Sequence, residues 1–119
     1  MTWYCVKTIS KRERSAAKHL RKDGYEVYCP ITPPPKTKKK KEQEFDVDDA
    51  IAYFPCYIFI NLTEGRHDFP AVKQVKNVVN IIRAGDHYVK VPDIDIDTIK
   101  SMEDGRGLIR TSNDHYPGS

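Results

Sequence analysis

The stretch FPCYIFI, residues 54–60, is the most informative part of the sequence for the fold. It lies within residues 50–62, the most apolar segment of the chain. Strand side chains alternate between faces, so Cys56, Ile58 and Ile60 are expected on one face and Tyr57 and Phe59 on the other. Apolar residues at both sets of positions indicate a central strand buried on two sides, with Pro55 near its start.

The segments before this strand predict a strand, a helix and a second strand. In residues 3–8, Tyr4, Val6 and Thr8 alternate with Trp3, Cys5 and Lys7, as in a strand. Ser10 and Glu13 have the spacing of a capping box, which predicts a helix over residues 10–23 that ends at Gly24. Residues 25–31 predict another strand, closed by three prolines.

The segments after residue 62 predict a short helix, a strand and a final helix. Asp68 is placed to begin a helix with Pro70 in its first turn. Residues 78–83 predict a strand, and a helix follows from Asp93, with Ile96, Ile99 and Met102 along one side. The order is strand, helix, strand, strand, helix, strand, helix. It predicts an α+β, ferredoxin-like (RNP-like) βαββαβ antiparallel sheet with an appended C-terminal helix.

Charge is unevenly distributed along the 119 residues, although the net charge is only +3. Residues 7–22 contain seven basic residues and a single acid, Glu13. Such a helix suits contacts with a phosphate backbone, although a solvated basic helix face is an equally plain interpretation. Residues 36–49 carry five lysines followed by five acids and predict an exposed loop that could touch nucleic acid or fold back on itself.

The motifs of common catalytic and metal sites are missing from the sequence. The four histidines are scattered, and the three cysteines form no CxxC pair. No P-loop or nucleophile elbow occurs. Acylphosphatase-like chemistry would need a glycine-bearing anion loop after the first strand, and the loop there has no glycine. We therefore expect neither an enzyme nor a cofactor.

Four motifs, in order and with matching spacing, resemble the N-terminal (NGN) domain of bacterial NusG and RfaH-type transcription factors. The opening Trp3-Tyr4-x-Val6 is similar to the WYVV start of that family. Residues 14–30 resemble its ERKAAEHL…GFEVYLP stretch, residues 54–60 resemble FPGYLFV, and residues 77–93 resemble its GVxxFV…G…VPD block. Two positions depart from the pattern, because Cys56 and Asn77 stand where glycine is usual.

The resemblance implies docking on the coiled-coil clamp helices of the largest catalytic subunit of RNA polymerase. The candidate docking residues are apolar or aromatic: Tyr4, Phe54, Tyr57, Ile96 and Ile99. The first helix would face upstream or non-template DNA, with these candidates for phosphate or base contacts: Lys11, Arg12, Arg14, Lys18 and His19. An RRM-like RNA-binding module is the alternative, with Tyr57 and Phe59 as stacking residues.

The resemblance also implies an NGN domain over residues 1–104 and a linker over residues 105–119 leading towards a KOW domain outside this sequence. No run of about 18 apolar residues is present, so we expect no membrane span. The expected protein is a cytoplasmic, nucleoid-associated monomer. In RfaH-like factors, the loop before the second helix carries small polar residues that touch a second element of the polymerase. Residues 67–70 of this sequence differ from them, so we do not extend this second contact to the present chain.

Overall fold

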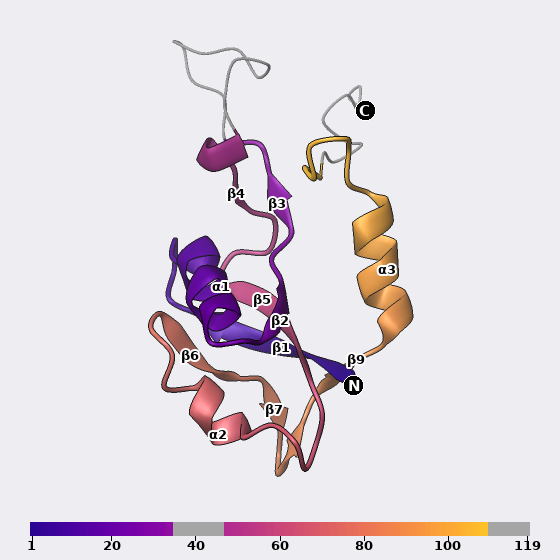
Figure 1. Cartoon of the computed structure of the whole chain (residues 1–119). Coiled ribbons are helices and arrows are strands. Elements are labelled where there is room, and N and C mark those ends of the chain that lie inside the picture. Colours follow the sequence, from indigo (N-terminus) through magenta and orange to yellow (C-terminus); the bar gives the residue numbers. More distant parts are fainter. Residues whose placement is uncertain (35–46, 110–119) are drawn as a thin grey trace.

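The computed structural model describes residues 1–34 and 47–109 (Figure 1). Most of the charged segment predicted as an exposed loop lies outside the described residues, and of it only Val47–Asp49 is seen, as the short 3-10 helix η2. The other elements, in chain order, are β1 (Thr2–Thr8), α1 (Glu13–Lys22), β2 (Glu26–Tyr28), β3 (Ile31–Thr32), β4 (Ile51–Ala52), β5 (Tyr57–Leu62), α2 (Phe69–Val72), β6 (Val78–Ile81), β7 (Arg83–Ala84), β8 (His87–Tyr88), β9 (Lys90–Val91) and α3 (Asp93–Ser101).

One antiparallel sheet organises these elements, and its strand order is β2-β5-β1-β6, with β9 pairing with the start of β1. Two small ribbons, β3–β4 and β7–β8, extend from it. Figure 1 shows α1 and α2 on one side of the sheet and α3 on the other. The predicted α+β architecture with an appended C-terminal helix is confirmed.

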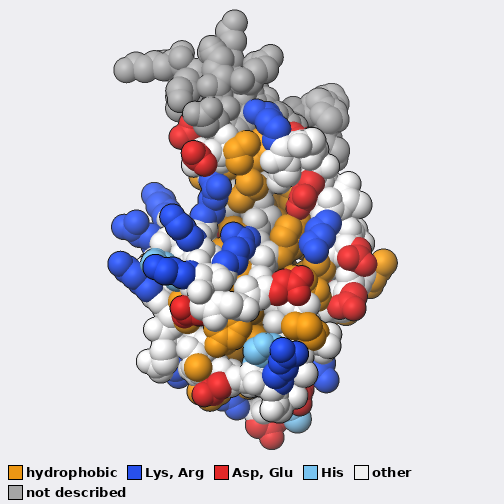
Figure 2. All heavy atoms as spheres, in the orientation of Figure 1, with side chains coloured by type: hydrophobic (Ala, Val, Ile, Leu, Met, Phe, Trp, Pro, Cys, Tyr) orange, Lys and Arg blue, Asp and Glu red, His pale blue; other side chains and the backbone are white. Residues whose placement is uncertain are grey.

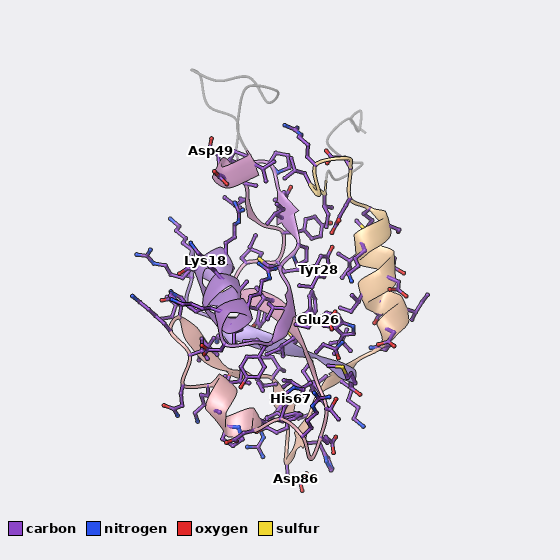
Figure 3. The ribbon with its side chains drawn as sticks, viewed as in Figure 1. Lys18, Glu26, Tyr28, Asp49, His67 and Asp86 are labelled. Atoms are coloured by element: carbon purple, nitrogen blue, oxygen red, sulfur yellow. The ribbon has the colours of Figure 1, made fainter. Side chains whose placement is uncertain are left out.

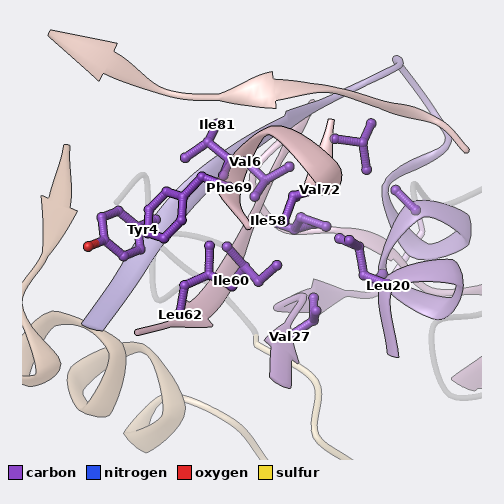
Figure 4. Close-up of a cluster of buried hydrophobic side chains, with 13 residues drawn as sticks. Tyr4, Val6, Leu20, Val27, Ile58, Ile60, Leu62, Phe69, Val72 and Ile81 are labelled. Carbon is purple, nitrogen blue, oxygen red and sulfur yellow. The ribbon is translucent and has the colours of Figure 1, made fainter. Parts of the chain in front are cut away.

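The main core lies between the sheet and helices α1 and α2 (Figure 4). From β5 it receives Ile58, Ile60 and Leu62, all fully buried. Alanines on α1 let that helix approach the sheet closely, and its Leu20 is also fully buried. The alternation predicted for β1 places Tyr4 in this same core.

A smaller cluster lies on the opposite face of the sheet, beneath α3. Trp3, Phe59 and Ile96 are its buried members. Phe54, Tyr28, Cys5, Val91 and Ile99 pack against them while remaining partly exposed. The expectation that residues 57–60 are apolar on both faces of a central strand is therefore correct, and the two faces meet different partners.

Three predicted strands are interrupted, and one of them, residues 78–83, divides into β6 and β7 at Ile82. Residues 25–31 divide into β2 and β3 because Pro30 has no amide to donate to a ladder. Residues 50–62 divide into β4 and β5, separated by a turn in which Tyr57 N donates to Phe54 O (3.1 Å). Cys56 lies in that turn with φ 71, a left-handed conformation that glycine adopts more easily.

The predicted capping box is wrong. Helix α1 begins at Glu13, and its N-cap residue, Arg12, makes no side-chain cap. Glu13 does not reach back to Ser10; its Oε2 accepts the amide of Cys56 at 2.7 Å. A long-range partner has replaced the local one, and the N-cap is Arg12, two residues later than the Ser10 that the pattern predicts. Its end is as predicted, with Gly24 at φ 95.

The start of the predicted linker is packed against the rest of the chain. Leu108 and Ile109 are fully buried. Ile109 N donates to Ile31 O at 2.8 Å, and Leu108 forms a parallel bridge with Ile31. Residues 105–109 therefore belong with the β3–β4 ribbon, while the division of the chain into domains stays a prediction.

Candidate functional site

The five predicted docking residues do not form one surface. Tyr4 is 1% exposed and lies in the main core, where its ring packs edge-on against Phe69 with centroids 5.0 Å apart. Its hydroxyl donates to Glu64 Oε1 at 3.4 Å. Strand alternation directs Tyr4 towards α2, whereas Tyr57 and Phe59 project from the opposite face. Tyr4 is therefore a core residue in this structure.

Phe54 lies at the edge of the smaller cluster, and Tyr57 lies on the same face of the sheet. Phe54 is partly exposed, and its ring packs edge-on against Phe59 (5.9 Å) and Tyr53 (4.8 Å). Tyr57 begins β5 opposite Lys7 and is 37% exposed. Both residues therefore combine aromatic area with access to a partner.

Helix α3 supplies the remaining two predicted residues. Ile96 is 1% exposed and fills the cluster, whereas Ile99 is partly buried at its border. Ile94, on the solvent side of α3, is 67% exposed. Ile96 therefore fastens α3 to the sheet, and Ile99 is the member of the pair that a partner could reach.

Sequence reasoning missed the contacts that hold the far end of α3. Lys100 Nζ lies 5.5 Å from the Trp3 ring centroid and 5.3 Å from that of Tyr28. The Tyr28 hydroxyl donates to Glu103 Oε2, and Figure 3 shows Tyr28 between the sheet and α3. Burial, reinforced by the Glu103 carboxylate, raises the pKa of Tyr28 well above its usual value. Alternation in residues 26–28 could have placed Tyr28 on this face, but not its partners.

The basic residues of α1 form the second candidate surface. Lys11, Arg12 and Lys18 are exposed, and His19 is half-buried. Figure 2 shows Lys and Arg side chains gathered over α1, on the side away from the sheet. This distribution agrees with the prediction that the basic residues of the helix face away from the sheet.

Arg14 differs from the other basic residues because its guanidinium is already engaged. Its Nη1 donates to three backbone carbonyls, those of Ala50 (2.9 Å), Val47 (3.0 Å) and Asp48 (3.2 Å). These oxygens belong to η2 and to Ala50, the residue between η2 and β4. The predicted phosphate contact of Arg14 is thus in competition with an intramolecular role.

Other chemistry is limited in the residues that the structure describes. Burial raises the pKa of the Cys5 and Cys29 thiols to about 11, so at neutral pH these two are poor nucleophiles. Across residues 1–34 and 47–109, no cluster of three or more His, Cys, Asp or Glu side chains could hold a metal ion. No helix in the same ranges is long and apolar enough to cross a membrane.

The RNA-binding alternative requires exposed aromatic rings on the sheet. Tyr57 and Phe59 do share one face, as that interpretation needs. Phe59, however, is 8% exposed, because Phe54 and Tyr28 pack around it (ring centroids 5.9 and 6.4 Å away). A base could therefore stack on only one of the two rings, which weakens this alternative.

Fold and surfaces together define an α+β domain with a partly open aromatic edge and a separate basic helix. The family model described as "Transcription termination factor nusG" matches residues 1–100. The chain belongs to the NusG family, because this match covers most of its length.

A solved structure of NusG from Thermotoga maritima, from work on domain interaction in that protein, has the same fold. The two share 20% identity with a TM-score of 0.58, over 82% of this chain and 54% of the other. This chain thus spans about half the length of that protein. No curated protein sequence matches it significantly.

Proposed function

We propose that the chain docks on the coiled-coil clamp helices of the largest catalytic subunit of RNA polymerase through an apolar docking edge formed by Phe54, Tyr57 and Ile99. The observation that carries this proposal is that Phe54 and Ile99 border one buried cluster, that Tyr57 lies on the same face of the sheet, and that all three side chains remain accessible. The tip of a helical hairpin can be accommodated by such an apolar border in the helix-in-groove mode.

The basic surface of α1 would contact nucleic acid while the docking edge contacts the polymerase. Lys11, Arg12 and Lys18 suit phosphate contacts because they are exposed and positively charged. His19 is half-buried and suits a closer contact with upstream or non-template DNA. The two surfaces belong to opposite layers of the domain, so both partners could be engaged together.

Docking in this position would modulate pausing and processivity by stabilising one state of the polymerase. A bound domain that bridges the polymerase cleft favours the closed state only as far as it binds that state more tightly. The aromatic edge supplies the binding free energy, and the basic helix adds a salt-dependent contribution.

The test is a binding measurement with purified bacterial RNA polymerase core enzyme. Phe54→Ala and Tyr57→Ala should each weaken binding by at least tenfold, since an aromatic anchor contributes about 2 kcal/mol or more. Ile94→Ala is the matched control, because Ile94 is an exposed apolar residue on the solvent side of α3. Full binding by both aromatic variants would reject the docking edge.

A separate measurement tests the basic helix. Lys18→Ala should reduce the salt dependence of duplex DNA binding by about one counterion while leaving polymerase binding unchanged. DNA binding that does not depend on salt would reject the electrostatic role of α1.

A further inference from the structure

Two adjacent residues at the start of α1 hold both ends of the segment that leads to the docking edge. Glu13 accepts the amide of Cys56 at 2.7 Å, and Arg14 donates to the carbonyl oxygens of residues 47, 48 and 50 at 2.9–3.2 Å. We propose that Glu13 and Arg14 are positioning residues that fix residues 47–57 so that Phe54 and Tyr57 are presented to the polymerase. This inference rests on the proposed function.

Glu13 supports the turn that places Phe54. The residue is only 7% exposed, and a buried carboxylate is unfavourable unless hydrogen bonds compensate for its lost hydration. The Cys56 amide is one donor, and Lys11 N is a longer second one at 3.4 Å. Thr8 N donates to Cys56 O at 2.8 Å, so both backbone groups of Cys56 are held. Its left-handed backbone is thereby maintained.

Backbone strain is concentrated at the same place. In the described part of the chain, the non-glycine residues with positive φ are Lys11 (66°), Cys56 (71°) and Asn77 (71°). Lys11 and Cys56 share the Glu13 carboxylate, and Asn77 Nδ2 donates to Ser15 Oγ, two residues further along α1. Strained residues persist only where their surroundings over-determine them, and they are frequent at functional sites. All three strained residues are therefore hydrogen-bonded to the first turn of α1, which also holds residues 47–57 in place.

Arg14 fixes the opposite end, and its chemistry is specific. A planar guanidinium can direct N–H groups at several converging carbonyl oxygens, whereas a lysine ammonium is a compact charge on a flexible stem. Arg14→Lys therefore keeps the charge of α1 while weakening the hold on η2 and β4. Although the sequence assigns Arg14 to DNA together with Lys18, its loss should affect polymerase binding instead.

The experiment compares Arg14→Lys with Lys18→Arg in the full chain, since both exchanges preserve charge on one helix. We expect Arg14→Lys to weaken binding to purified RNA polymerase core enzyme about fivefold, with the salt slope of duplex DNA binding unchanged. Lys18→Arg should leave both measurements as in the wild type. Glu13→Gln, which retains shape but not charge, should also weaken polymerase binding and shift the amide resonance of Cys56.

A double-mutant cycle separates positioning from general destabilisation. If Arg14 acts by positioning Phe54, then Arg14→Lys should weaken polymerase binding less than about twofold when Phe54 is already replaced by alanine. The effects of substitutions at two coupled residues are not additive. An undiminished fivefold loss there, or wild-type polymerase binding by Arg14→Lys, would overturn the inference while leaving the docking edge intact. Absence of polymerase binding by the wild type would instead reject the proposed function, and the inference with it.

Discussion

The two faces of the sheet differ in how completely they are covered. Towards α1 and α2, Val6, Ile58 and Ile60 are fully buried. Towards α3, Tyr57 remains 37% exposed and Phe54 is partly exposed. The first face is a closed core, and the second retains aromatic area that no helix of the described chain covers. Apolar residues of similar type therefore have different roles on the two faces.

The difference follows from the number of helices on each face. Two helices share one face, whereas α3 alone crosses the other and contributes a single fully buried side chain, Ile96, to it. The end of the sheet near Tyr57 and Lys7 extends past this cover. An edge of this kind is what a protein partner needs, since binding hot spots combine aromatic area with access.

The largest effect is expected from a truncation on the closed face. Ile60→Ala should destabilise the protein by about 2–5 kcal/mol, because the deleted atoms leave a cavity in a fully buried site. Ile94→Ala, at an exposed position beside the open face, should change stability by less than about 0.5 kcal/mol. Chemical denaturation measures both, and equal losses would contradict the comparison.

Alkaline pH should lower the stability of the closed face, because the Cys29 thiol packs against the main core. Burial raises the pKa of this thiol from 9.0 to about 11. The folded-state pKa lies above the unfolded-state pKa. The contribution of the protonated Cys29 thiol to the free energy of unfolding is therefore complete below about pH 9 and is lost as the pH rises through 11. The loss should be about 2 kcal/mol. Denaturation at pH 8 and pH 11 should show a smaller decrease for Cys29→Ala than for the wild type.

A smaller effect is expected at the polar contacts that secure α3 on the open face. Tyr28→Phe removes the hydroxyl that donates to Glu103 and should cost about 1 kcal/mol. Amide hydrogen exchange should become faster in the last turn of α3, while α1 remains protected. Faster exchange throughout the sheet would show that this contact supports the whole fold and not the open face alone.

The smallest effect on stability is expected in the turn between β4 and β5, which contains Cys56. Cys56→Gly should stabilise the protein by up to about 1 kcal/mol, because glycine adopts a φ of 71° without steric cost. Gly24→Ala, at φ 95 with open space around the added methyl group, should destabilise it by a similar amount. Thermal unfolding distinguishes the two, and a loss of stability in Cys56→Gly would show that the thiol packs usefully.

Element types and alternation were predictable because they depend on neighbouring residues. The period of two in β1 correctly separated Tyr4 and Val6 from Trp3 and Cys5. It could not show which face would be accessible, since that depends on α3, about 90 residues later in the chain. The prediction that Tyr4 contacts the polymerase was made without this information.

The functions of the charged residues were less predictable, for the same reason. Arg14 and Lys18 have similar sequence surroundings, yet within the described residues it is Arg14 that has carbonyl partners, 33–36 residues away. Glu13 matched a local capping pattern, but the Cys56 amide, 43 residues away, is its partner. A pattern in the sequence describes local preference, and it fails where a distant group offers a stronger hydrogen bond.

The family match ends at residue 100, whereas the packing continues to Ile109 through its hydrogen bond with Ile31. A recombinant fragment trimmed at the last matched residue would leave the Ile31 carbonyl unpaired and uncover the methyl group of Ala50, which packs with Leu108. Exposed strand edges of that kind promote aggregation. Anyone preparing this polypeptide for crystallisation or NMR should keep the additional nine residues.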